Sequence, residues 1–198
     1  MGTKDNNLKK QPLNCCYSIS KFSQHQALKD MTLMLVNSQD SKSIINNQGY
    51  YSDNIFRTDW HLAQDYTRPW ISILKPSIDQ HMSAVMESLG YAQTELDNMW
   101  FQQYNKGSGH GWHVHMFCQW TNVYYLDFPQ GSPKTQLVSP FDQSTIFEVD
   151  VEEGDILTFP SIVIHRAPAV ETDNVKTIVS FNLNSSLITT TVLEEING

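Results

Sequence analysis

The chain has 198 residues, of which 40% are hydrophobic and 17% are charged. This length suits one domain, and the hydrophobic content is enough to build a core, which excludes wholesale disorder. Thirteen Lys and Arg residues against twenty-one Asp and Glu residues give a formal net charge of -8. A protein that grips phosphate backbones without sequence preference usually has the opposite balance, so the charge argues against non-specific nucleic-acid binding.

Neither membrane insertion nor export is expected. No apolar run approaches the roughly eighteen residues of a membrane-spanning helix, and the polar residues 1–10 lack the apolar centre of a secretion signal. The three cysteines are odd in number, two of them are neighbours, and no CxxC metal motif is present: Cys15, Cys16 and Cys118. A disulfide scaffold is therefore not indicated, and we expect a cytoplasmic protein.

The N-terminal half gives weak local signals before residue 77. Residues 1 to about 20 have the composition of a weakly structured lead-in, and residues 37–53 that of a loop rich in Ser, Asn, Asp and Gln. Residues 54–66 show a weak helical pattern. We expect these segments to lead into the first well-defined helix.

The strongest helix is predicted over residues 77–90. Ser77 is the expected N-cap, Gln80 occupies the capping-box position, and Gly90 is the expected stop. Apolar side chains spaced at the helical period should form one face that packs in the core: Ile78, Met82, Val85, Met86 and Leu89.

After Gly90 the chain consists of short β-type runs separated by turn residues. Strands are predicted over residues 99–104, 120–128, 136–138, 145–151, 155–159, 162–165 and 175–183. Many short strands with few helices indicate a mainly β (α+β) jelly roll. We expect a single domain over residues 1–198, divided into an N-terminal extension with bracing helices (1–95), a jelly-roll core (96–186) and a C-terminal tail (187–198).

Three of the seven histidines lie within six residues, at positions 110, 113 and 115. Residues i and i+2 of a strand share a face, so His113 and His115 should present two imidazoles side by side. A third ligand must come from elsewhere, and His165 ends a later strand that a jelly roll can return beside the first. Imidazole suits Fe, Zn, Cu and Ni, so the sequence predicts a three-histidine metal site.

The other histidines have less context. His110 does not share the parity of His113, and a supporting role, a substrate role and no role all remain open. His25, His61 and His81 are expected to be ordinary structural histidines.

Residues 104–182 resemble the catalytic core of the Fe(II)/2-oxoglutarate-dependent oxygenases. That family has an upstream Tyr and Gly, a His-x-Asp motif, a Tyr-Tyr-Leu strand, a Gly-Asp-apolar-Phe strand, a distal His and then a basic residue. This sequence has the same order in Tyr104, Gly107, His113-x-His115, Val123-Tyr124-Tyr125-Leu126, Gly154-Asp155, Phe159-Pro160, His165 and Lys176. The His-x-His form is similar to a subgroup that is often encoded by phages.

The resemblance implies a double-stranded β-helix fold and an oxygenase that uses Fe(II), 2-oxoglutarate and O2 to hydroxylate a peptide or small molecule. His113 and His165 match the two metal-binding histidines, and His115 stands where the family has a carboxylate. Lys176 matches the basic residue that pairs with the distal carboxylate of 2-oxoglutarate. Three further residues are implied to help form that pocket: Tyr125, Ser180 and Tyr104.

Two other interpretations stay open. The spacings Gly107-x5-His113-x-His115-x3-Gln119 and Gly154-x5-Pro160-x4-His165 resemble the two cupin motifs, with Gln119 as a possible fourth ligand to Fe, Zn or Mn and no use of 2-oxoglutarate. The jelly roll could instead be a non-catalytic binding or structural module in which the histidines hold a structural Zn. Metal-dependent binding of 2-oxoglutarate separates the oxygenase from both.

Overall fold

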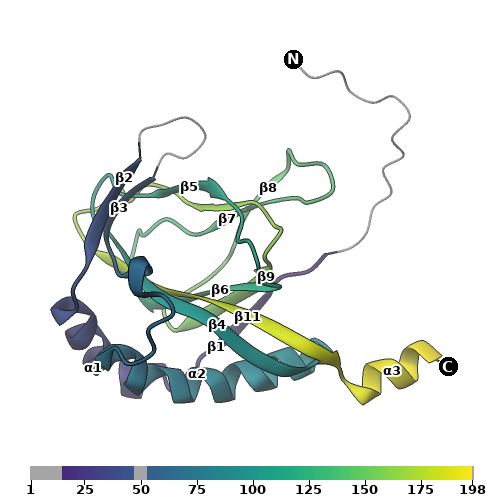
Figure 1. Ribbon diagram of the computed structural model, residues 1–198. Helices are drawn as coiled ribbons and strands as arrows, with labels where there is room; N and C mark the ends of the chain where they lie inside the picture. Colours follow the sequence, from purple (N-terminus) through teal and green to yellow (C-terminus); the bar gives the residue numbers. More distant parts are fainter. Residues whose placement is uncertain (1–14, 47–52, 198) are drawn as a thin grey trace.

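The computed structural model describes residues 15–46 and 53–197, which form two facing antiparallel sheets flanked by helices (Figure 1). The larger sheet has the strand order β1 (Ser18–Lys21), β9 (Asp155–Pro160), β6 (Trp120–Asp127), β11 (Lys176–Ile188), β4 (Tyr91–Tyr104), β3 (Asp53–Thr58) and β2 (Lys42–Asn46). The smaller sheet has the order β5 (His110–His113), β10 (His165–Ala167), β7 (Gln136–Val138) and β8 (Ile146–Glu148). The predicted mainly β jelly roll with bracing helices is confirmed.

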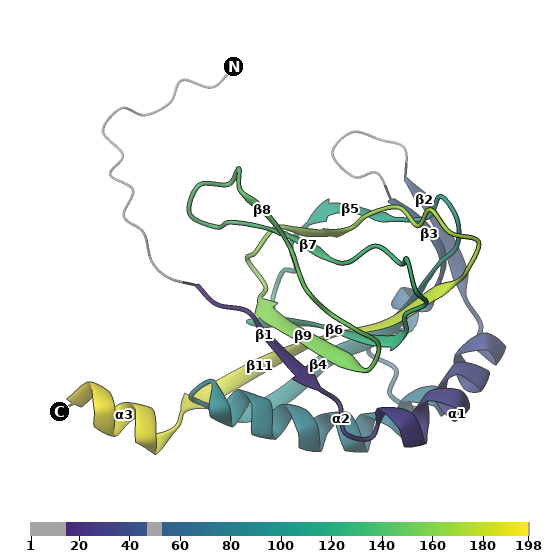
Figure 2. The same ribbon diagram turned by 180° about the vertical axis from the view of Figure 1, so that it is seen from behind.

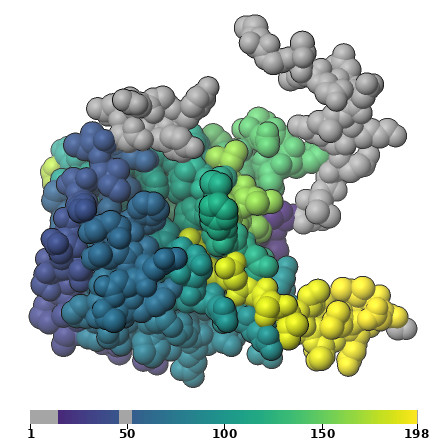
Figure 3. All heavy atoms as spheres, viewed as in Figure 1, coloured from purple at the N-terminus to yellow at the C-terminus, as the bar shows by residue number. Residues whose placement is uncertain are grey.

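The helices α1 (His25–Ser38) and α2 (Pro69–Ser88) lie along the outer face of the larger sheet (Figures 1 and 2). Helix α1 was not predicted, although Leu28, Thr32 and Val36 recur every four residues and face the core. The short 3-10 helix η1 (Trp60–Leu62) precedes α2, and α3 (Thr190–Asn197) projects from the body at the C-terminal end (Figure 3). Among the described helices, none combines the length and apolarity needed to cross a membrane.

Helix α2 begins eight residues earlier than predicted. Pro69 occupies its first turn, where a missing N–H costs nothing and the fixed φ angle suits a helix. Ser77 follows Pro76 inside the helix and caps neither end. The predicted apolar face is confirmed for Ile78, Met82 and Met86, and Gly90 ends the segment with φ +88°. A Cβ at Gly90 would lie 2.7 Å from Val192 Cγ2 of α3, so this turn has room only for glycine.

Three N-terminal predictions are wrong because each segment contains a strand that was not predicted. Residues 54–66 form strand β3 and η1 in place of a helix, and the predicted loop contains β2, with residues 47–52 outside the described part of the chain. The predicted lead-in contains β1, which pairs with β9 from Ser18 to Lys21, while residues 1–14 also lie outside the described part. These strands lie at or near the sheet edges, where the partner strand determines the conformation more than local sequence does.

The predicted C-terminal strands are confirmed with shifted ends. β4 and β11 are longer than expected, at 14 and 13 residues, and pair along their length. β10 covers 165–167 and not 162–165, because Ile162 lies in an exposed turn. Residues of the predicted tail form the end of β11 and helix α3.

Strand β11 separates the two cores. Val179, Phe181 and Leu183 pack between the larger sheet and the helices, whereas Ile178 packs between the two sheets. Side chains alternate along a strand, so Lys176, Ser180 and Asn182 share the inner face with Ile178. The inner face of β11 therefore supplies polar side chains to the space between the sheets.

A buried ion pair joins the start of α2 to the larger sheet. The Asp59 carboxylate accepts hydrogen bonds from the Arg68 guanidinium, from Trp70 Nε1 at 2.9 Å and from the Phe101 N–H at 2.9 Å. The side chains of Asp59 and Arg68 are 0% and 3% exposed. We expect Asp59→Ala to lower the free energy of unfolding by about 3–5 kcal/mol, because it leaves the Arg68 charge buried without a partner.

Chemical denaturation monitored by Trp fluorescence would measure this loss. The matched control is Asp79→Ala, which breaks the exposed pair of Lys75 and Asp79 within α2 and should leave stability nearly unchanged. Equal losses in the two variants would contradict the role of the buried pair.

Candidate metal centre

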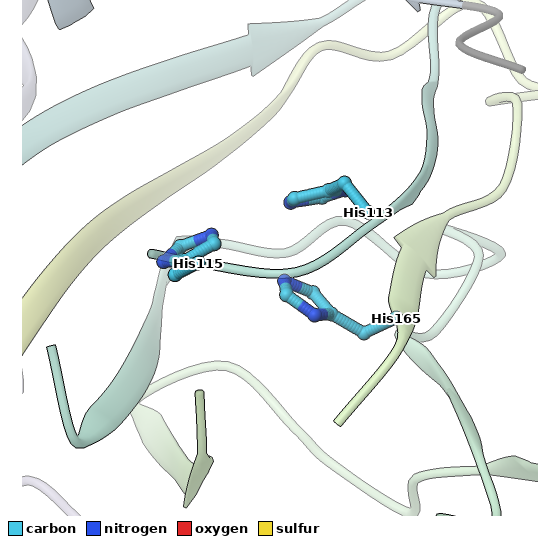
Figure 4. Close-up of side chains that lie close together, drawn as sticks. All are labelled: His113, His115 and His165. Atoms are coloured by element: carbon cyan, nitrogen blue, oxygen red, sulfur yellow. The ribbon is translucent and has the colours of Figure 1, made fainter. Parts of the chain in front are cut away.

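Three histidines, two from paired strands and one from the segment that follows the first strand, converge between the sheets. His113 ends β5, His115 follows two residues later, and His165 begins β10. β5 and β10 are antiparallel and place His165 directly opposite His113. One ring nitrogen of each histidine lies within 4.8 Å of those of the other two. Figure 4 shows the three rings turned toward a common space, as the sequence predicted.

Hydrogen bonds fix which nitrogen each ring presents. Nδ1 of His113 lies 2.8 Å from the Gly111 carbonyl oxygen, and Nδ1 of His165 lies 3.0 Å from the Val163 carbonyl oxygen. Nδ1 of His115 lies 2.6 Å from Asn182 Oδ1. All three acceptors are oxygens that cannot donate, so each Nδ1 carries the proton and each Nε2 keeps a free lone pair. This pattern is typical of metal-binding histidines.

Burial keeps the three rings neutral. It lowers the pKa of His165 well below its ordinary value, lowers that of His113, and lowers that of His115 to about 4. A metal can therefore bind at neutral pH without first displacing protons. Among the described residues, these three histidines are the one group of three or more His, Cys, Asp or Glu side chains placed to hold a metal ion.

His110 also belongs to this cluster, a role that the sequence left open. Its ring stacks on His113 with centroids 3.7 Å apart, and its Nε2 lies 3.5 Å from Asp53 Oδ1. Gln102 Nε2 lies 3.4 Å from His110 Nδ1 on the other side. The shifted register between β5 and β10 overrides the strand parity that separated His110 from His113.

Two of the other histidines make structural contacts away from the cluster. His25 Nδ1 lies 2.7 Å from the Tyr124 hydroxyl, and His81 Nε2 lies 2.9 Å from Ser20 Oγ. His61 lies in η1.

A small cavity of about 20 Å³ adjoins the three rings. Two of the residues implied by the resemblance, Tyr104 and Ser180, line it. The hydroxyl groups of Tyr104 and Ser180 both donate to Gln102 Oε1, at 3.0 and 3.4 Å. Trp100 also lines the cavity, and its buried Nε1 has no hydrogen-bond partner among the described residues.

The other two implied residues, Lys176 and Tyr125, lie behind this lining. Lys176 Nζ donates to the Pro133 carbonyl oxygen at 2.8 Å and lies 5.6 Å from the ring centroid of Tyr104 and 6.0 Å from that of Tyr125. The Tyr125 hydroxyl is 2.7 Å from the hydroxyl of Thr135, which does line the cavity. Lys176 is almost fully buried, and this burial lowers its pKa to about 7.

Gln119 is engaged elsewhere. Its Oε1 accepts the Ser185 N–H at 2.6 Å on β11, so the fourth ligand expected from a cupin site is bound to the backbone. Arg166, on β10 beside His165, stacks on Trp112 at 4.4 Å and donates to Gln136 Oε1 at 2.8 Å.

The residues that support the cluster were not predicted from the sequence. Asn182, Asn98 and Gln102 all lie on β11 and β4 and contact a histidine directly or through one another. The available signal for Asn182 was its spacing of two from Ser180 on one strand face. The other two depend on the pairing of β4 with β11, which a single sequence does not give.

A scan of the sequence against protein-family models found no match, and neither did a search of curated proteins. Solved structures do match. A prolyl-4-hydroxylase from Pseudomonas putida is 14% identical, with a TM-score of 0.58, over 87% of this chain and 94% of that one. A Trichoplax adhaerens prolyl hydroxylase, in complex with a hypoxia inducible factor peptide fragment, is 16% identical, with a TM-score of 0.59, over 85% and 83%.

A third match is the epimerase SnoN from nogalamycin biosynthesis, in complex with Fe3+, alpha ketoglutarate and nogalamycin RO. It is 14% identical, with a TM-score of 0.64, over 86% of this chain and 79% of that one. Identities this low establish the architecture and leave the chemistry to the site. The chain has the double-stranded β-helix fold of the Fe(II)/2-oxoglutarate-dependent oxygenases, as its motif order predicted.

Proposed function

We propose that this protein is an Fe(II)- and 2-oxoglutarate-dependent oxygenase that hydroxylates a C–H bond of a peptide or small molecule. The observation that carries the proposal is the convergence of His113, His115 and His165, each with a free Nε2, inside a fold shared with such enzymes. A matching structure, SnoN, was solved with both iron and alpha ketoglutarate. When bound, Fe(II) would supply the redox chemistry that couples decarboxylation of 2-oxoglutarate to substrate oxidation.

The donor set fits a divalent ion that takes an anionic co-ligand. Three neutral imidazoles would leave the charge of a bound ion uncompensated and would leave room for further ligands. The buried, unpartnered Nε1 of Trp100 lines the same cavity and is a donor suited to an oxygen of that co-ligand. Both features support a 2-oxoacid as the co-ligand.

Lys176 is the residue that we propose holds the far carboxylate of 2-oxoglutarate. It forms no ion pair with any described residue, and burial alone accounts for its lowered pKa. Lys176 begins β11 and shares a strand face with Ser180, whose hydroxyl lines the cavity. Tyr104 and Tyr125 would help to enclose the same carboxylate. Because the cavity holds only about 20 Å³, these side chains must move apart to admit the molecule.

The substrate would approach through a second space beside the metal centre. A groove of about 360 Å³ shares His110, Arg166 and Ala167 with the metal cavity and is also lined by Asp53 and Trp112. A matching prolyl hydroxylase was solved with a peptide fragment, which supports a peptide as one candidate class. We further propose a cytoplasmic location, supported by the three free cysteines, and one folding unit, supported by the pairing of β1 with β9 and β3 with β4.

Anaerobic titration of the protein with Fe(II) and 2-oxoglutarate tests the proposal, followed by measurement of succinate with a panel of peptides and small molecules. We expect 2-oxoglutarate to bind only when metal is present and succinate to form once O2 is admitted. Metal binding without 2-oxoglutarate binding would favour the cupin interpretation. A Zn ion that survives chelation, with no oxygen consumption, would favour a structural module.

The variant His165→Ala should lose metal binding, because His113 and His115 alone leave the ion without its third protein ligand. Titration with Co(II), followed by absorption of the bound ion, measures this directly. His81→Ala is the matched control, since His81 contacts Ser20 outside the cluster. Unchanged Co(II) binding by His165→Ala would remove the proposed site.

The affinity for 2-oxoglutarate should fall as pH rises above about 7. Burial lowers the pKa of Lys176 to about 7, so the free protein loses this positive charge there, while a bound carboxylate would raise the pKa again. Between the pKa of Lys176 in the free protein and its pKa in the complex, the dissociation constant for 2-oxoglutarate should rise about tenfold per pH unit. One proton should be taken up on binding in this range. Isothermal titration in buffers of different ionisation enthalpy measures both.

The control for this dependence is a pair of variants. Lys176→Met should bind weakly at every pH, whereas Lys106→Met, which removes a lysine from an exposed pair with Asp173, should behave as the wild type. A wild-type affinity that is constant from pH 7 to pH 9 would exclude Lys176 as the carboxylate partner.

A further inference from the structure

A chain of side chains connects His115 to a carboxylate outside the cavity. His115 Nδ1 donates to Asn182 Oδ1 at 2.6 Å, Asn182 Nδ2 donates to Asn98 Oδ1 at 2.8 Å, and Asn98 Nδ2 donates to Asp97 Oδ2 at 2.6 Å. Asn182 on β11 lies directly opposite Asn98 on β4. We call Asn182, Asn98 and Asp97 the amide relay.

The relay has only one direction. An ionised carboxylate accepts hydrogen bonds and cannot donate, so Asn98 must turn its NH2 group to Asp97 and its carbonyl to Asn182. Asn182 must then donate its own NH2 group to Asn98 and present its carbonyl oxygen to His115. The proton on the His115 ring is therefore held on Nδ1, and the lone pair is held on Nε2.

His115 needs this arrangement more than the other two ligands do. His113 and His165 donate to backbone carbonyl oxygens, which can only accept a hydrogen bond. The partner of His115 is an amide side chain, which is able to present either its oxygen or its NH2 group. An amide turned the other way would place a donor against Nδ1 and move the ring proton to Nε2, which would block metal binding.

Burial makes the relay selective. Asn182 is 4% exposed, so water has little access to replace a lost partner. Asn98 and Asp97 are half-buried, so the outer end of the relay lies nearer to solvent than Asn182 does. The relay thus runs from the Asp97 carboxylate to the cavity wall through two amides.

We propose that Asn182, Asn98 and Asp97 are positioning residues that fix His115 as an Nε2 donor and so prepare the third metal ligand. The proposal rests on the proposed metal site and adds a role for residues that touch neither metal nor substrate. In this proposal the Asp97 carboxylate acts on His115 through three successive hydrogen bonds.

Two measurements on the full chain test this inference. Long-range 1H–15N correlation NMR of the metal-free protein reports which nitrogen of His115 carries the proton, and Co(II) titration reports affinity and the absorption spectrum of the bound ion. We expect the wild type to show only the Nδ1-protonated ring. In Asn182→Leu, both ring forms should be present and Co(II) should bind roughly 10–100-fold more weakly.

Asp97→Asn tests the direction of the relay. Its amide can accept or donate, so the two amides that follow are free to turn, and His115 should again show both ring forms with weaker Co(II) binding. Glu95→Gln is the matched control, because it removes an exposed carboxylate two residues away on β4 and should change neither measurement. Thermal unfolding of each variant shows that the fold is retained.

A charge-conserving double variant covers the case in which Asn182→Leu does not fold. Asn182→Asp combined with Asp97→Asn places the carboxylate against His115 and reverses both amide bonds, which keeps an acceptor at Nδ1. We expect a single Nδ1-protonated form and Co(II) affinity equal to or tighter than that of the wild type. A mixture of ring forms in this double variant would overturn the proposal, as would unchanged ring protonation and Co(II) affinity in Asp97→Asn.

These outcomes are separate from the test of the proposed function. A wild type with the expected ring form and tight Co(II) binding, but no production of succinate, would overturn the oxygenase and keep the relay. If the protein produces succinate and the relay variants behave as the wild type, the oxygenase is kept and the relay is overturned.

Discussion

The pairing of His165 with His113 across β10 and β5 is the contact on which the site depends. Directly opposed residues of an antiparallel pair share a face of the sheet, so the rings meet there with centroids 4.1 Å apart. A slip of one residue would move His165 to the other face and leave two ligands from one segment. The register is held on the far side of β10, where His165 also pairs with Leu137 of β7.

The two sheets contribute different residues to the site. The smaller sheet, with strands of three or four residues, holds two of the three candidate metal ligands, His113 and His165. The larger sheet, anchored by the helices and the pair of Asp59 with Arg68, supplies the residues that support the rings or would meet the cosubstrate. Ligand geometry therefore depends on short strands that pack against long, well-braced ones, with Ser180 and Asn182 at the contact.

The parts of this architecture that are local in sequence could be predicted. The strands after Gly90 alternate or run apolar within themselves, and the His113-x-His115 spacing indicated the ligand pair, although β5 ends at His113 and His115 lies two residues beyond it. The edge strand β1 could not be found, because its hydrogen bonds come from β9, far along the chain. Strand β2 pairs with the neighbouring β3, but its residues have the polar composition of a loop. The relay is non-local in the same sense as β1, since Asn98 and Asn182 are 84 residues apart and meet only through the pairing of β4 with β11.

The buried ammonium of Lys176 has a consequence for the folded state itself. An unfolded chain holds this proton up to a pKa near 10.4, whereas burial lowers the pKa to about 7. The buried charge therefore lowers the free energy of unfolding at neutral and lower pH. This free energy rises again as the pH increases from about 7 towards the pKa of the unfolded chain. A dicarboxylate that pairs with this charge would stabilise the folded state, so the cosubstrate would contribute to stability as well as to the reaction.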